Sequence, residues 1–295
     1  RAIDREDLDS KIAGAAMDAG AEFMYGTKYI SHIITDRVTM ATSSCSIESQ
    51  LIVGADGHSS AVARSIPGSR PAEYLRGIQA DVSVRMEHQD RFRVHIGSGL
   101  APGFFTWEIP CGDFTRVGLC TSWSAGPPMD NLKALLRKVG AEGRVVGLHS
   151  GKIPLHQRGD IVADRTALVG DAACQVKPVS GGGLYPGLTA AGLLSDVLSD
   201  SIRDGDFTKK RLSAYANDCD KAFGSELRKG WRLRRMFVRM SDEDLNAAGR
   251  YASREDVRAA LDGIDIDHPS GVVADVMRHP SAVLSAIPLM LRCIV

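Results

Sequence analysis

The sequence has no excess of charge of either sign and no long apolar run. Lys plus Arg equal Asp plus Glu at 36 each, so nothing in the charge balance indicates nucleic acid as a partner. No secretory signal opens the chain, and no apolar stretch reaches the roughly 18 residues that a membrane-spanning helix needs. The apolar segment 282–295 is short and is interrupted by Pro288 and Arg292, which favours a packed or surface-lying helix.

The sequence also lacks metal-ligand spacing. Its cysteines form no C-x-x-C pair and stand at no zinc-type distance from a histidine. Scattered single cysteines in a chain of this length are typical of a reducing compartment, so we expect a cytoplasmic protein without a metal. The cysteines are Cys45, Cys111, Cys120, Cys174, Cys219 and Cys293.

A third absence is the dinucleotide fingerprint G-x-G-x-x-G after a strand. The run 97–103 contains three glycines, but their spacing is wrong and the surrounding sequence alternates in the manner of antiparallel strands. The chain also begins at Arg1 rather than at Met, within a polar helix-start pattern.

The first part of the chain has the sequence pattern of an α/β fold. Apolar residues at helical spacing predict a helix over residues 5–19, which Gly20 ends. Short strands follow at 21–23, 28–34, 37–42 and 46–53. The last of these ends in an apolar run before Gly54, as a parallel strand does when it enters a turn.

The hydrophobic pattern then changes twice. Alternation between residues 74 and 121 predicts antiparallel strands, and a short helix is expected at 129–139. An apolar strand returns at 166–171, a long helix follows from Leu184 to about residue 201, and the rest is helical or loop. This order predicts an α/β fold in which an antiparallel sheet is inserted within a nucleotide-binding domain.

The strongest motif is the run from Leu168 to Tyr185. A strand delivers Gly170 and Asp171 at its carboxyl end, where α/β sheets bind ligands, and the carboxylate can accept hydrogen bonds from a sugar-like hydroxyl. Three glycines, including Gly182 and Gly183, then open the helix at Leu184. Glycines let backbone amides approach a ligand, and a helix start favours an anion. The alternative is a tight left-handed turn with tolerated glycines.

A second motif is the turn Gly54-Ala55-Asp56-Gly57 with Ser59 and Ser60 behind it. The serines can cap a following helix. A cofactor role for Asp56 and a plain strand–turn–helix connection are equally compatible with this pattern.

Together these segments resemble FAD enzymes of the aromatic-hydroxylase type, and more closely the geranylgeranyl reductase family, which includes archaeal digeranylgeranylglycerophospholipid reductases. The likeness covers nearly the whole chain. It is carried by the residues Ile3-Asp4-Arg5 and Asp9, by the run 102–110, by Gly170-Asp171-Ala172-Ala173 with the later glycines, and by 215–242.

The resemblance implies an FAD cofactor and assigns residues to it. Arg5 resembles the arginine that contacts FAD from the first helix, and Tyr29 the residue whose backbone touches the adenine side. Asp171 resembles the aspartate on the ribityl chain. Gly183 and Leu184 resemble the backbone pair that faces the isoalloxazine, with Gly182 beside them.

The resemblance also implies a prenyl-binding cavity. The run 105–110 resembles the family's aromatic Tyr-x-Trp-x-Phe-Pro pattern, with Phe105 in place of the tyrosine and Ile109 in place of the phenylalanine. Trp107 and Pro110 match the pattern directly. Without the resemblance, Trp107 would equally be a core aromatic residue on a sheet face.

Two departures from the family pattern stand out. Cys174 replaces a glycine, and if that position needs a positive φ the side chain costs on the order of 1 kcal/mol. The family opens with the dinucleotide fingerprint, so we expect the first strand–turn–helix unit of the FAD domain to lie upstream of Arg1.

The complete prediction is a Rossmann-like FAD-binding domain at residues 1–66 and 160–200, truncated at its N-terminus. An antiparallel-sheet substrate domain is expected at 67–159 and a helical region at 201–295. The implied activity is the FAD-dependent saturation of C=C bonds in geranylgeranyl chains, with a prenylated lipid as the substrate. The electron donor would be NAD(P)H or a ferredoxin-like protein, and the site of action the membrane surface. A flavin monooxygenase and a non-catalytic flavoprotein remnant remain the alternatives.

Overall fold

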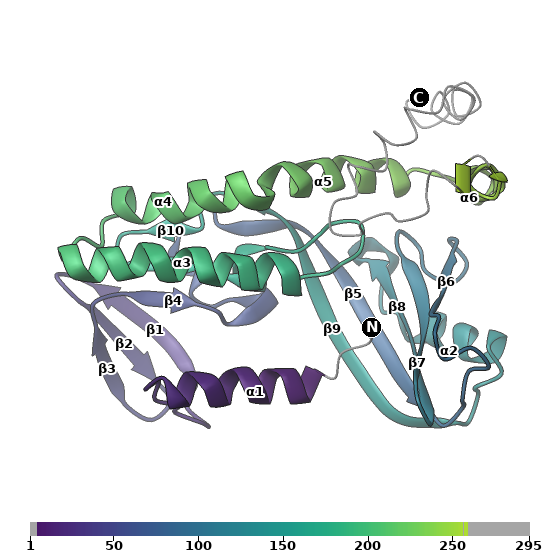
Figure 1. Ribbon diagram of the computed structural model, residues 1–295, viewed down its shortest axis with the longest axis horizontal. Helices are drawn as coiled ribbons and strands as arrows, with labels where there is room; N and C mark the ends of the chain where they lie inside the picture. The colour runs from purple at the N-terminus through teal and green to yellow at the C-terminus, as the bar shows by residue number, and fades with distance from the viewer. Residues whose placement is uncertain (1–4, 256, 259–295) are drawn as a thin grey trace.

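A computed structural model of the chain describes residues 5–255, 257 and 258, which form a mixed α/β fold (Figure 1). The predicted apolar segment 282–295 lies outside the described residues, as does the end of the predicted helical region. The chain opens with α1 (Arg5–Asp18), close to the predicted helix 5–19.

Two small sheets follow from the first part of the sequence. β1 (Tyr29–Ile34), β2 (Val38–Thr42) and β3 (Ser46–Ser49) form an antiparallel sheet. β4 (Ile52–Gly54) pairs in parallel with β11 (Thr166–Leu168), and β10 (Val162–Ala163) joins the other edge of β11. Two segments far apart in the sequence therefore end side by side, as the two apolar runs predicted.

Two strand predictions in this region were wrong. Residues 21–23 form no strand. The predicted strand 46–53 is split between two sheets, because the chain turns at Gln50 and Leu51. There the hydroxyl of Ser49 donates to the carbonyl of Leu51 at 2.9 Å, and Arg165 donates to the carbonyl of Gln50 at 2.7 Å.

The predicted antiparallel region is a five-stranded sheet in the order β6-β7-β8-β5-β9. Its strands are long, and each one pairs in antiparallel fashion with its neighbours. The strands are β5 (Arg70–Val82), β6 (Arg93–Ile96), β7 (Phe105–Cys111), β8 (Phe114–Ser122) and β9 (Val145–Arg158).

Sequence patterning did not predict β9. It is an edge strand, and Val145 and Val146, neighbours in the chain, are both exposed, at 43% and 68%. Burial therefore does not alternate along it, and the period-2 signal that marks a half-buried strand is absent.

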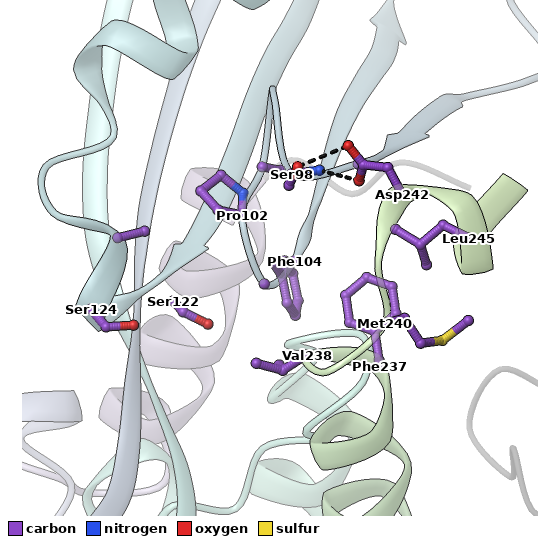
Figure 2. Close-up of a pocket in the computed structure, with 14 residues that line it drawn as sticks. Ser98, Pro102, Phe104, Ser122, Ser124, Phe237, Val238, Met240, Asp242 and Leu245 are labelled. Atoms are coloured by element: carbon purple, nitrogen blue, oxygen red, sulfur yellow. Dashed lines mark hydrogen bonds between the residues drawn. The ribbon is translucent and has the colours of Figure 1, made fainter. Parts of the chain in front are cut away.

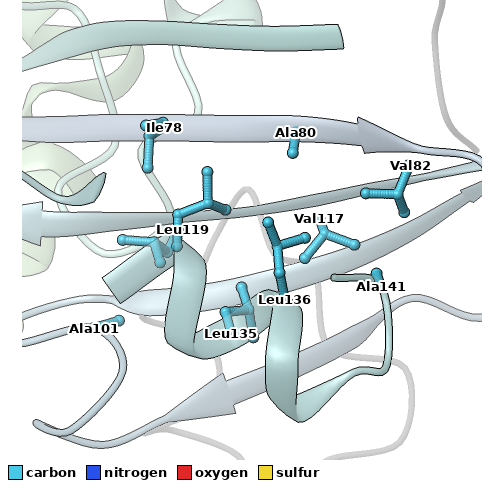
Figure 3. Packing of buried hydrophobic residues seen from close by; sticks show 10 residues of the cluster. Ile78, Ala80, Val82, Ala101, Val117, Leu119, Leu135, Leu136 and Ala141 are labelled. Atoms are coloured by element: carbon cyan, nitrogen blue, oxygen red, sulfur yellow. The ribbon is translucent and has the colours of Figure 1, made fainter. Parts of the chain in front are cut away.

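One face of the five-stranded sheet is covered by α2 (Met129–Lys138), which matches the predicted helix 129–139. Leu135 and Leu136 of this helix lie on Ile78, Val117 and their neighbours, and the result is a closed apolar core (Figure 3). The opposite face packs on Phe104 and on Val176, a residue of the glycine-rich loop. The sheet therefore joins the predicted cofactor loop through its other face.

A helical layer completes the fold. It lies along one side of the parallel strands, and α4 and α5 run end to end above α3 (Figure 1). A single π-helical turn, residues Asp220–Gly224, connects them. The helices are α3 (Leu184–Asp204), α4 (Lys209–Cys219), α5 (Ser225–Phe237) and α6 (Asp242–Ala252).

Candidate functional site

The glycine-rich loop begins where β11 ends. Gly170 has a φ of +65°, which glycine adopts without strain, and Asp171 lies in the 3-10 turn Gly170–Ala173. Gly183 is the last residue before α3. A Cβ on Gly183 would lie 3.2 Å from Oδ1 of Asp171. The missing side chain therefore lets the carboxylate approach the helix start closely.

Asp171 is partly buried, and no described residue donates a hydrogen bond to its carboxylate. Burial raises the pKa of this carboxyl, while the charges of His58 and Arg5 lower it by less. A buried carboxylate without a donor is costly unless a ligand supplies one. A hydroxyl-bearing ligand at the start of α3 would supply it.

The loop is fixed from behind by two side chains that the sequence motifs did not single out for this role. Gln175 accepts a hydrogen bond from the backbone N–H of Gly170 at 2.7 Å and donates to the hydroxyl of Tyr215 at 2.8 Å. Tyr215, fully buried on α4, donates in turn to the carbonyl of Leu168 at 2.8 Å. No periodicity in the sequence relates Gln175 to Tyr215, since only the fold brings them together.

Cys174 has a φ of 53° and a ψ of 33°. The backbone here is left-handed, which is the condition under which a side chain at this position is costly, so Cys174 is strained where glycine would not be. The thiol is buried, and burial together with the charge of Asp171 raises its pKa to about 12. It lines a cavity of about 250 Å³ together with Asp171, His58 and Arg64.

The other predicted cofactor residues differ in their surroundings. The Asp56 carboxylate accepts hydrogen bonds from the Ser60 hydroxyl at 2.6 Å and from the N–H groups of Ala61 and Val62 at 2.6 and 3.3 Å. These contacts hold its own turn together. The hydroxyl of Tyr29 lies 2.7 Å from Nδ1 of His32, and burial raises the pKa of Tyr29.

Arg5, Gly182 and Leu184 complete the predicted set. Arg5 is ion-paired with Asp9 on the exposed side of α1 at 3.2 Å, and its charge acts on Asp171. A Cβ on Gly182 would lie 3.1 Å from Cε of Lys177, so this glycine closes the loop. Leu184 opens α3 and is 36% exposed.

The four predicted substrate residues line one cavity of about 770 Å³. Phe105, Trp107 and Ile109 alternate along β7 and so lie on the same sheet face, and Pro110 follows them. Phe105 stacks on Phe104 with ring centres 4.2 Å apart and meets Trp107 edge-on at 6.2 Å. The aromatic run therefore forms a continuous wall.

This cavity reaches the glycine-rich loop, because Ser180 and Gly181 also line it. Gly181 has a φ of +72°, and a Cβ there would lie 3.0 Å from Cδ1 of Ile153. The predicted substrate cavity and the predicted cofactor loop thus meet at Gly181. Polar cavity residues were not predicted; they are Gln79, Gln89, Asp90, Arg91, Arg116 and Ser180.

A third cavity, of about 280 Å³, lies between the loop 97–103 and the junction of α5 with α6 (Figure 2). Asp242 accepts hydrogen bonds from the N–H and the hydroxyl of Ser98, both at 2.8 Å, which attaches α6 to the loop 97–103. Phe104 lines both this cavity and the larger one.

Comparison with solved structures identifies proteins with the same fold. No family model matches the chain. The fold is that of FAD-binding flavoproteins. A geranylgeranyl bacteriochlorophyll reductase-like protein from Thermoplasma acidophilum superposes with a TM-score of 0.81 at 18% identity, over 97% of this chain and 75% of that one. The flavin-dependent halogenase CmlS superposes with a TM-score of 0.65 at 16% identity, over 95% and 59%.

Sequence relatives are more specific. The chain is 28% identical to the digeranylgeranylglycerophospholipid reductase of Methanothrix thermoacetophila, over 86% of this chain and 69% of the relative. It is also 28% identical to reductase 2 of that name from Methanopyrus kandleri, over 83% and 65%. The predicted resemblance to the geranylgeranyl reductase family is thereby confirmed, and both relatives are named as reductases. The chain spans about two thirds of their length.

Two further observations concern the described residues alone. None of their helices combines the length and apolarity needed to cross a membrane. Within the same part of the chain, no group of three or more His, Cys, Asp or Glu residues is placed to hold a metal ion.

Proposed function

We propose that this chain forms the substrate cavity and the flavin-facing loop of an FAD-dependent reductase that saturates C=C bonds of geranylgeranyl chains, in particular those of membrane ether lipids. The observation that carries the proposal is the junction at Gly181. There a 770 Å³ cavity walled by Phe105, Trp107 and Ile109 opens onto the loop that holds Asp171 and Gly183.

The residues of the loop fit FAD. The Asp171 carboxylate has no donor within the described residues and would take a ribityl hydroxyl, and the missing side chain of Gly183 lets this carboxylate lie close to the start of α3. The start of α3 carries partial positive charge, which stabilises an anion there. Arg5, Tyr29, Gly182 and Leu184 complete the proposed site, whereas the Asp56 carboxylate holds its own turn. When bound, reduced FAD supplies the hydride.

The cavity residues orient the substrate. An isoprenoid chain is apolar along its whole length, so a cavity with aromatic walls binds it by burial alone. Polar side chains also line this cavity, and Gln89, Asp90 and Arg91 lie in the loop before β6. The two polar side chains beside Trp107 on the sheet are themselves engaged. Gln79 bonds to Trp107, and Nε of Arg116 lies 3.5 Å from Asp81. The ring face of Trp107 can also stabilise cationic character on a carbon atom during protonation of the double bond.

The proposed partners follow from this chemistry. The substrate is a prenylated lipid, which places the cytoplasmic protein at the membrane surface during turnover. The reducing equivalents come from NAD(P)H or from a ferredoxin-like protein.

The test is reduction without oxygen. Chemically reduced, flavin-loaded protein should convert geranylgeranyl lipids into products heavier by one H₂ per double bond, as measured by mass spectrometry. Trp107→Ala should slow this conversion while FAD stays bound, because the residue is assigned to the cavity. An unchanged lipid together with oxygen-dependent hydroxylation of an aromatic compound would establish a monooxygenase instead. Failure to take up flavin even in a version extended at its start by a strand–turn–helix unit with the G-x-G-x-x-G fingerprint would indicate a non-catalytic remnant.

A further inference from the structure

The indole of Trp107 lies directly on a neighbouring strand. Trp107 of β7 is opposite Gly118 of β8, and Gly118 is opposite Gln79 of β5. A Cβ on Gly118 would lie 2.6 Å from Cε2 and Cζ2 of the indole and 2.7 Å from Nε1. Only glycine at this position lets the ring lie flat against the sheet.

The third residue of this row holds the ring in place. Nε1 of Trp107 donates to Oε1 of Gln79 at 3.1 Å. Because indole N–H can only donate, the Gln79 amide must present its oxygen to Trp107. Its Nε2 then points along β5 and donates to Oδ1 of Asp81 at 3.3 Å.

Asp81 is itself fixed, so the amide cannot turn. Oδ1 of Asp81 lies 3.5 Å from Nε of Arg116 on β8, and Oδ2 lies 3.4 Å from Nε2 of His149 on β9. Hydrogen bonds thus join Trp107, Gln79 and Asp81, and the ion-pair contacts of Asp81 reach β8 and β9. The orientation of the Gln79 amide is therefore determined twice: the Trp107 N–H needs its oxygen, and the Asp81 carboxylate needs its NH₂ group.

We propose that Gln79 and Gly118 are positioning residues that hold the Trp107 indole flat on the sheet, and that they thereby set the width of the cavity for a methyl-branched isoprenoid chain. The identity of the ligand rests on the proposed function. Gly118 removes the obstacle beneath the ring, and Gln79 prevents the ring from rotating away. An indole that lifts off the strand has only the cavity to move into.

The first experiment reads the ring itself. The chain contains three tryptophans, Trp107, Trp123 and Trp231, so indole ¹⁵N–¹H spectra give three resonances, and Trp107→Phe identifies one of them. Gln79→Leu and Gly118→Ala should each shift the Trp107 resonance and leave the other two in place. Gly151→Ala is the matched control, because a Cβ there meets nothing within 4 Å on the same sheet.

The second experiment reads the cavity. Binding of geranylgeraniol is compared with binding of an unbranched alcohol of the same carbon number. Gly118→Ala should weaken geranylgeraniol binding by about tenfold, because the packed sheet cannot accommodate an added methyl group under the ring. It should weaken binding of the straight-chain alcohol by less than about threefold. Gln79→Leu should weaken geranylgeraniol binding about threefold, the effect of one hydrogen bond. In a Trp107→Phe background, Gln79→Leu should have no further effect.

The outcomes separate this proposal from the proposed function. An unmoved Trp107 resonance in both variants, or equal losses for branched and straight chains, would overturn the positioning role. A parent protein that binds geranylgeraniol with these variant effects but reduces no lipid would instead overturn the proposed function and leave the positioning role standing.

Discussion

The half of the molecule that contains the substrate cavity is built very differently from the half that contains the cofactor loop. The five-stranded sheet has strands of up to 14 residues and a closed core under α2. In the other half, the parallel strands β4 and β11 have three residues each, and α1 buries none of its side chains. Ile30 and Ile33 of β1 are 60% and 69% exposed.

This difference indicates how the two sites are maintained. The aromatic wall of the cavity is fixed by strand register within one sheet, although Ser180 and Gly181 of the cofactor loop also line the cavity. The cofactor loop has few strands beneath it and is fixed by side chains from α4, chiefly Tyr215. We therefore expect the cavity to keep its ligand under conditions that abolish flavin binding.

The largest expected effect concerns FAD. Because the 295 residues contain no G-x-G-x-x-G, the chain should bind FAD at least about 100-fold more weakly than a version extended at its start by a strand–turn–helix unit with this fingerprint. Two charge-assisted hydrogen bonds to phosphate, at about 1.5–3 kcal/mol each, account for such a factor. Flavin fluorescence titration measures it. Geranylgeraniol binding should be equal in both proteins, and stoichiometric FAD binding by the unextended chain would contradict the assigned cofactor site.

The second prediction concerns the residue that ties α5 to the sheet. Arg234 is 1% exposed and donates to Glu73 at 3.2 Å, to the carbonyl of Gly103 at 2.9 Å and to the hydroxyl of Ser122 at 3.2 Å. Arg234→Met should lower the free energy of unfolding by about 2–4 kcal/mol, because the Glu73 carboxylate loses its counter-charge while keeping some solvent contact.

Urea denaturation checks this, with Arg235→Met on the exposed side of the same helix as the control, expected within about 0.5 kcal/mol of the parent. Adding Glu73→Gln to Arg234→Met should restore part of the loss. An Arg234→Met protein as stable as the parent would show that α5 is held by apolar contacts alone.

The sequence predicted more of the site than of the framework around it. Alternation along 104–109 predicted a strand, and the apolar runs before Gly54 and Gly170 predicted two parallel strands. These predictions depend only on local periodicity, whereas the cavity role of Phe105, Trp107 and Ile109 came from the family resemblance. The sequence could not predict β9, because its exposed edge removes the periodic signal. Nor could it predict the positioning role of Gln79 and Gly118. Their role arises from cross-strand register, which joins residues 28 and 11 positions from Trp107 in the chain.

The third prediction concerns the carboxylate of the cofactor loop. Burial raises the pKa of Asp171, so its ionisation opposes folding. The stability associated with this group is complete below the unfolded-state pKa and is lost as pH rises through the raised folded-state pKa. Asp171→Asn should therefore be more stable than the parent at pH 7, and this gain in stability should vanish toward acidic pH. The variant should also bind FAD more weakly than the parent.

Asp56→Asn provides the matched contrast. Its carboxylate already accepts three hydrogen bonds within its turn, so this substitution should lower stability at pH 7. Denaturation curves at several pH values distinguish the two. Equal loss of stability in both variants would show that Asp171, like Asp56, holds its own loop rather than a ligand.

The smallest expected effect is at Cys174, and it tests backbone strain within the cofactor half. With φ at 53°, any residue with a Cβ costs about 1 kcal/mol relative to glycine, whereas a buried thiol contributes packing of similar size. Cys174→Gly should therefore stay within about 1 kcal/mol of the parent. Cys174→Ala loses the thiol and keeps the strain, so it should be less stable than Cys174→Gly by about 1 kcal/mol. This order is the reverse of that expected in a regular strand or helix. The glycine variant should also hold FAD at least as well as the parent, since its loop is free to settle around the flavin. An alanine variant more stable than the glycine variant would mean that the left-handed turn is absent in solution.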